Sequence, residues 1–199
     1  MKTSIIAPSI LALGAVLIAA PAFAQSSTWT IDPNHSQANF TIRHLGVSNV
    51  HGSISKVSGK VTWDEKDLSK DSVVADLDAT TVDTTVTARD THLKSPDFFN
   101  VAQFPTLHFE STKVWKEGGA IKVTGNLTLA GVTKPVTLDV DGPVAPQKQK
   151  SRDGKEYLIS GFSASTTIKR SDFGFGPKFA PPTLGDEVKV SIDVEMDLR

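Results

Sequence analysis

The 199-residue chain contains no cysteine, and this absence excludes two classes of protein. Disulfide frameworks and thiolate chemistry both need that side chain. The chain also lacks a strong charge of either sign, because 21 basic residues face 22 acidic ones. A nucleic-acid-binding domain would carry clustered lysine and arginine, so we expect no nucleic-acid partner. Stability must come from a hydrophobic core, which a chain of this length can build as one domain.

Long hydrophobic runs are absent beyond the N-terminus. Lys2 precedes an apolar stretch over residues 5–20, and residues 22–24 give the small-x-small pattern of a cleavage site. The stretch is too short for a transmembrane helix. We therefore expect residues 1–24 to be a signal peptide and residues 25–199 to be the mature domain. We expect a soluble, exported protein in a bacterial periplasm.

Alternation of apolar and polar residues dominates the rest of the chain and predicts β-strands. In the clearest strand, an apolar face repeats from Val188 to Leu198, and the opposite face is wholly polar or charged. Shorter strands are expected over residues 38–44, 46–54, 58–63, 72–77, 106–115, 120–129, 132–140 and 157–169. Residues 145–156 are expected to be an exposed loop or hairpin tip, and residues 171–185 to be irregular. The pattern favours an all-β antiparallel barrel of about eight strands, whose interior can hold one small ligand.

One stretch in the middle of the chain departs from this alternation. Val86, Asp90 and Leu93 recur at helical spacing and predict a short helix. Residues 95–97, Ser-Pro-Asp, have the form of a second helix start. Charged groups then stand at one end of the stretch and the pair Phe98-Phe99 at the other. The stretch is either a lid over a hydrophobic interior or a crossover whose phenylalanines fill the core.

The chemistry-bearing side chains allow more than one interpretation. The five histidines show no metal-site spacing, so we expect no metal. His44 shares a strand face with apolar residues and would be a polar group inside an apolar pocket. Asp90 and His92 are compatible with acid–base chemistry, or Asp90 pairs with its neighbour Arg89. The pair Lys169-Arg170 is either solvated or meets a phosphate or quinone head group.

Seven motifs follow one another through the expected mature domain. They are Trp29-x-Ile31-Asp32-x-x-His35-Ser36, Phe40-x-x-x-His44-Leu45-Gly46, Arg89-Asp90-x-His92-Leu93-x-Ser95-x-Asp97-Phe98-Phe99, Pro105-x-x-x-Phe109-x-Ser111-Thr112, Gly125-x-Leu127-Thr128, Gly131-Val132-Thr133-Lys134-Pro135-Val136 and Lys169-Arg170-Ser171-Asp172-Phe173-Gly174. Together they resemble the YceI-like family of periplasmic polyisoprenoid-binding proteins. Two positions depart from the pattern: Ala130 stands where histidine often precedes the turn, and Ile54 stands where phenylalanine is common.

The resemblance implies a lipocalin-like barrel that holds a long-chain isoprenoid lipid, a polyisoprenoid or an isoprenoid quinone, with the helical insertion covering the cavity. It implies a carrier without catalysis or a catalytic cofactor, and it suggests a homodimer; we also expect transient membrane contact. An enzyme acting on such a lipid through Asp90 and His92 is one alternative, and a small-ligand sensor is another. The residues expected to contact the lipid are His35, Phe40, His44, Arg89, Asp90, His92, Leu93, Phe98, Phe99, Phe109, Phe162, Lys169, Arg170 and Phe173.

Overall fold

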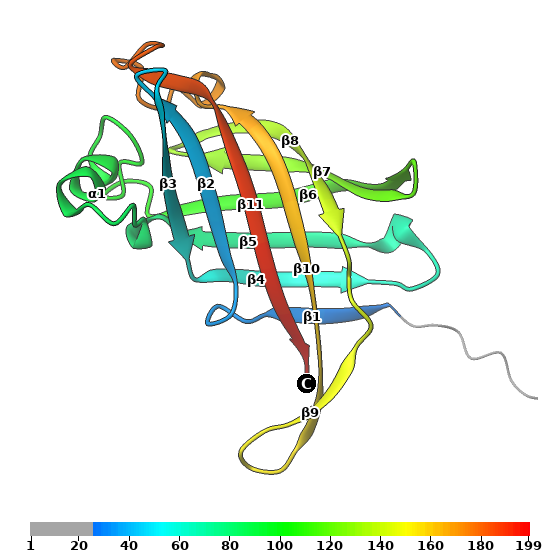
Figure 1. The fold of residues 1–199 in the computed structure, drawn as a ribbon. Helices are drawn as coiled ribbons and strands as arrows, with labels where there is room; N and C mark the ends of the chain where they lie inside the picture. Colours follow the sequence, from blue (N-terminus) through cyan, green and yellow to red (C-terminus); the bar gives the residue numbers. More distant parts are fainter. Residues whose placement is uncertain (1–25) are drawn as a thin grey trace, which may run out of the picture.

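The computed structural model describes residues 26–199, so the predicted signal peptide lies outside the described residues. The described residues form one antiparallel sheet with a single α-helix (Figure 1). The strands are β1 (Ser27–Ile31), β2 (Gln37–His44), β3 (Ser48–Ser55), β4 (Val57–Trp63), β5 (Ser72–Asp78), β6 (Thr106–Glu117), β7 (Ala120–Leu129), β8 (Val132–Asp141), β9 (Gln147–Lys150), β10 (Glu156–Lys169) and β11 (Leu184–Leu198). The helices are α1 (Thr87–Lys94) and three short 3₁₀ turns, η1 (Leu68–Lys70), η2 (Ala79–Thr81) and η3 (Arg170–Phe173). No helix in this part of the chain is long and apolar enough to cross a membrane.

The sheet closes because β10 and β11 pair along almost their whole length, from Leu158 opposite Leu198 to Lys169 opposite Glu187. Along the other edge of β11, β2 pairs with its first part and β1 with its end. In the next position, β3 pairs with β2 and β4 pairs with β1. Thus β1 and β2 share one position of the barrel, and β3 and β4 share the next. With β5, β6, β7, β8, β10 and β11 the barrel has eight positions. The predicted barrel of about eight strands is confirmed, and closure pairs the two longest strands, β10 and β11, with each other.

A buried serine holds the break between β1 and β2. The Ser36 hydroxyl donates to the carbonyl oxygen of Glu195 at 3.2 Å and accepts from the Glu195 N–H at 3.0 Å. Ser36 is 4% exposed, and an unpaired hydroxyl at such a site would be costly. The side chain therefore replaces ladder hydrogen bonds to β11 where the chain passes from β1 into β2.

The two ends of the barrel differ in packing. Where β1 crosses β11, Trp29, Ile31 and Met196 are at most 2% exposed and form a solid core. Nearer the other end, Val190 and Ile192 are only half buried although they point inward on the same strand. Half-buried side chains inside a barrel show that the interior is not filled there. The predicted inner face of β11 is confirmed, but it faces a core at one end and a cavity at the other.

The helical prediction was right for α1 and wrong for a second helix after Ser95. The chain makes turns instead: the N–H groups of Phe98 and Asn100 both donate to the Ser95 carbonyl at 3.0 Å. Asn100 then takes a left-handed φ of 48°, which ends any helical path. Phe98 and Phe99 are 8% and 7% exposed. Successive side chains of an α-helix point about 100° apart, so a helix would not bury both rings toward one interior.

Candidate functional site

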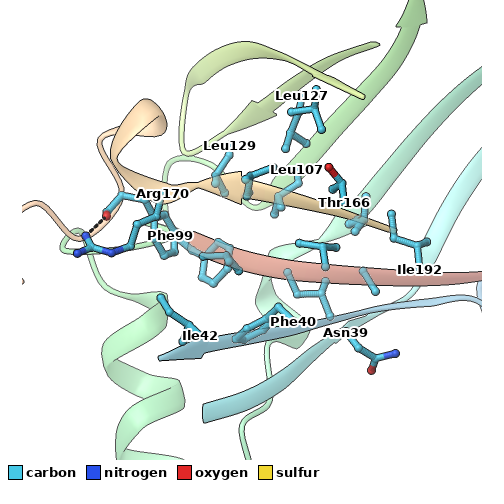
Figure 2. A pocket seen from close by; sticks show the side chains of 18 of the residues that line it. Asn39, Phe40, Ile42, Phe99, Leu107, Leu127, Leu129, Thr166, Arg170 and Ile192 are labelled. Atoms are coloured by element: carbon cyan, nitrogen blue, oxygen red, sulfur yellow. Dashed lines mark hydrogen bonds between the residues drawn. The ribbon is translucent and has the colours of Figure 1, made fainter. Parts of the chain in front are cut away.

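The end of the barrel opposite the Trp29 core contains an apolar cavity of about 370 Å³ (Figure 2). Its wall comes from the inward faces of β2 to β8, β10 and β11, and its mouth from α1 and the loop before β11. Along β11 the lining runs from Leu184 to Ile192, a length of at most about 26 Å measured along the tilted strand. Ligand pockets are commonly about 300–1,000 Å³ and mostly apolar. The cavity has the size and character of a site for an apolar ligand.

Two phenylalanines lie flat in the wall because glycines face them. A side-chain Cβ at Gly52 would stand 2.3 Å from Cζ of Phe40, its cross-strand partner. A Cβ at Gly125 would stand 2.4 Å from Cζ of Phe109. Since neither glycine has a side chain, each ring rests against the neighbouring strand. The glycines thereby keep space in the cavity that the rings would otherwise fill.

The mouth is bridged by aromatic contacts between the segment after α1 and the loop before β11. Phe98 stacks on Phe179 with ring centroids 5.3 Å apart, and Phe175 lies 5.4 Å from Phe98. A salt bridge joins the same two segments, because Lys178 Nζ donates to Asp97 Oδ1 at 2.7 Å. The hydrogen bond from Lys178, and a second from His92, lower the pKa of the Asp97 carboxyl. The two segments therefore form one continuous rim.

Arg170 organises the loop before β11 from inside. It is 4% exposed, and its Nε donates to the carbonyl oxygen of Gly185 at 2.8 Å. Nη1 donates to the carbonyls of residues 175 and 176, and Nη2 to those of residues 179 and 184. A guanidinium has five N–H groups, so all of them are used (Figure 2 shows the side chain). Arg170 borders the cavity but has no N–H left for a ligand.

Arg89 borders the cavity with most of its donors free. Its Nε donates to the Thr84 hydroxyl and its Nη2 to the Thr84 carbonyl, both at 2.7 Å. The Thr84 hydroxyl in turn donates to Asp90 Oδ1, which also accepts from the Thr84 N–H at 2.8 Å. Within residues 26–199, three of the five N–H groups of Arg89 thus lack a protein acceptor. Thr84 and Asp90 position this arginine at the mouth.

Ten of the fourteen residues expected to contact a lipid line the cavity: Phe40, His44, Arg89, His92, Leu93, Phe98, Phe99, Phe109, Phe162 and Arg170. Their contact with a ligand remains a prediction. The other four, His35, Asp90, Lys169 and Phe173, lie outside the lining.

Each of the four lies outside for a physical reason. His35 lies in the turn before β2, at the other end of the barrel, and is bonded to Asp32. Asp90 is held by Thr84, as described above. Lys169 is exposed, because its neighbours on β10 take the inward positions. Phe173 is 3% exposed and packs in the core.

The sequence interpretation missed the cavity residues of the irregular segment, above all Phe175, Phe179 and Leu184. Their segment has no strand or helix periodicity, so the pattern did not show which way they face. The one available signal was the recurrence of phenylalanine among the glycines and prolines of residues 171–185. Aromatic residues in such a segment are unusual unless they are buried.

Among residues 26–199, one group of three potential metal ligands lies close together: Asp32, His35 and Glu195, with ligand atoms within 4.8 Å of one another. His35 Nδ1 stands 2.8 Å from Asp32 Oδ2 and 3.5 Å from Glu195 Oε1. The hydrogen bond to Asp32, and then the charge of Glu195, raise the pKa of His35. The two carboxylates therefore favour the protonated form of His35, and the absence of a metal remains a prediction.

Comparison with known proteins agrees with the architecture. A family model described as the YceI-like domain matches residues 29–196. Protein YceI of Salmonella arizonae is 42% identical over 161 residues, which is 81% of each chain. The crystal structure of the Campylobacter jejuni YceI protein is 33% identical, with a TM-score of 0.64 over 79% of this chain and 90% of that one. A polyisoprenoid-binding domain from Saccharophagus degradans is 14% identical, covers 86% of this chain and 98% of its own, and has a TM-score of 0.63, which shows the shared fold. The chain belongs to the YceI-like family.

Proposed function

We propose that this protein is a periplasmic carrier that holds a long-chain isoprenoid, or a similar amphiphilic lipid, inside the barrel without catalysis. The observation that carries the proposal is the apolar cavity of about 370 Å³, open at the α1 end and closed by the Trp29 core at the other. The Saccharophagus domain with the same fold binds a polyisoprenoid, as its name states, which supports this class of ligand. The apparent signal peptide supports the compartment.

The tail of the lipid supplies most of the affinity in this proposal. At about 0.3 kcal/mol per heavy atom, a tail of about twenty carbons contributes about 6 kcal/mol, and one of forty about 12 kcal/mol. A hydrogen bond from a charged donor at the mouth adds about 1.5–3 kcal/mol. The mouth therefore selects among head groups, while the wall holds the ligand.

Arg89 is the side chain we assign to the head group. Its three free N–H groups suit a forked contact with a phosphate or carboxylate oxygen, or a single contact with a quinone carbonyl. Arg170 is not suited to this role because its donors are already used. This assignment narrows the sequence-based hypothesis, in which either arginine could meet the head group.

The geometry favours binding over the enzymatic alternative. Asp90 binds Thr84, whereas His92 Nε2 stands 3.2 Å from Asp97 Oδ2. The two proposed acid–base residues are thus held by different partners. Transient membrane contact and a homodimer remain part of the proposal. Light scattering at micromolar concentration measures the dimer directly, and a monomer there would remove it without affecting the cavity.

A pair of tryptophan substitutions on β11 tests the carrier. Val190 lines the cavity and Ser191, its neighbour, is exposed on the outer face. Val190→Trp fills the lumen with an apolar side chain, so we expect the affinity for a fluorescent polyprenol analogue to fall by at least about tenfold, with the fold retained. Ser191→Trp is the control and should bind as the wild type does. Equal binding by both variants, with circular dichroism showing folded protein, would contradict binding inside the barrel.

A further inference from the structure

The turn between β2 and β3 carries apolar side chains that the fold does not need. Leu45 is 54% exposed and Val47 is 75% exposed. Leu45 also takes a left-handed φ of 51°, a region where asparagine or glycine is favoured and leucine is not. Neither core packing nor turn formation accounts for these residues. An exposed leucine in an unfavourable backbone conformation indicates that its side chain contacts another molecule.

This turn is fixed against the loop that precedes β11. The Leu45 N–H donates to the Thr183 carbonyl at 3.1 Å, and the Pro182 ring lies against Gly46. Pro181 and Pro182 are themselves exposed. We call Leu45, Gly46, Val47, Pro181 and Pro182 the apolar tip. In Figure 1 the β2–β3 turn and the loop before β11 stand together at the top of the barrel.

The apolar tip is continuous with the cavity mouth. His44, next to Leu45, and Thr183, next to Pro182, both line the cavity, as does Leu184. A lipid leaving the cavity between these residues would pass the tip first. The segments 43–49 and 177–184 contain Arg43 and Lys178 and no acidic residue. Lys178 is paired with the carboxylate of Asp97, whereas Arg43 Nη1 donates to the neutral side chain of Asn49 at 3.2 Å.

We propose that the apolar tip is a docking surface for a phospholipid bilayer, into which Leu45 and Val47 insert while the cavity mouth faces the membrane. This inference rests on the proposed carrier function and gives it a route of loading. A bilayer fits because Leu45 and Val47 project into solvent from a turn, where they can insert among lipid chains. The adjacent arginine favours anionic head groups, and the cavity opens beside the tip. Removing the apolar area from water supplies the attraction.

The test is flotation with vesicles of phosphatidylethanolamine and phosphatidylglycerol. The variant Leu45→Asn with Val47→Ser removes the apolar groups, and asparagine tolerates the left-handed turn, so the fold should be kept. The control is Val144→Ser, because Val144 is also 54% exposed but follows β8 and contacts Gly161 away from the tip. We expect the fraction of protein bound to vesicles to fall by about tenfold or more in the tip variant and to be unchanged in the control.

Three results would overturn the docking surface. The first is that the wild type does not float with the vesicles. The second is that the wild type, the tip variant and the Val144→Ser control float equally. The third is that light scattering shows a dimer in the wild type that the tip variant has lost. Lipid extraction from the same preparations tests the carrier separately. If every preparation contains lipid but none floats, the docking surface alone is contradicted. If the proteins float but neither contain lipid nor take it up from detergent, the carrier function alone is contradicted.

Discussion

Replacement of Arg170 by methionine should destabilise the whole protein although the side chain forms no ion pair within residues 26–199. Five carbonyl oxygens would lose their donors at once. At about 1 kcal/mol net for each bond, the sum over the five bonds is about 5 kcal/mol. Four of the five carbonyls lie in half-buried residues that water can reach in part, and Gly176 is buried. A desolvated cation is removed as well, so we expect a loss of about 3 kcal/mol.

Urea denaturation followed by tryptophan fluorescence measures this loss as a shift of the midpoint at constant m-value. Arg170→Lys is the informative control, because it keeps the charge but has three N–H groups on one nitrogen, and cannot reach five carbonyls. We expect it to be nearly as unstable as Arg170→Met. A loss below about 1 kcal/mol for methionine, or full rescue by lysine, would refute the hydrogen-bonding role.

Three further predictions concern the wall, the core and the turn before β2. Gly52→Ala should displace the Phe40 ring and cost about 1–3 kcal/mol by overpacking, measured by thermal unfolding; an unchanged melting temperature would show that the ring moves freely. Met196→Asp places a charge in the solid core and should unfold the protein, whereas Ile192→Asp faces the cavity and should destabilise the fold less while reducing the lipid content. Circular dichroism measures the folding of both variants, and lipid extraction measures their lipid content. Equal unfolding of the two variants would contradict the division of the barrel into a core and a cavity. Because the pKa of His35 is raised, its bond to Asp32 stabilises the fold fully below pH 6.5, and this stabilisation is lost as the pH rises through the raised pKa. NMR titration should show a pKa of His35 above 6.5 that returns toward 6.5 in Asp32→Asn. An equal pKa in the wild type and the variant would exclude a stabilising pair.

The sequence allowed the barrel to be predicted because alternation records which face of a strand is buried. The residues from Val188 to Leu198 gave the inner face of β11 correctly. The same pattern could not show where the solid core ends and the cavity begins, because aliphatic residues serve both. Volume depends on the opposite wall, including glycines such as Gly125 that leave room for a ring.

The rim could be predicted only in part. Phe98 and Phe99 were recognisable as buried residues, but their partners come from a segment without periodicity. Arg170 was noticed for its charge, yet its partners are backbone carbonyls, which every residue carries and no sequence pattern identifies. His35 was expected to contact the lipid because it belongs to the first motif of the family resemblance. The lining of the cavity begins only at Ala38 of β2, whereas His35 is exposed in the preceding turn and is bonded to Asp32.

The central claim is that the cavity holds a lipid in the cell, and native mass spectrometry tests it most directly. The wild-type protein should be purified from the periplasm of its own host without detergent. We predict a second mass above that of the polypeptide, corresponding to one bound amphiphile, which organic extraction removes and identifies by its repeating isoprenoid fragments. A polypeptide of bare mass that also takes up no polyprenol when one is offered would contradict the account.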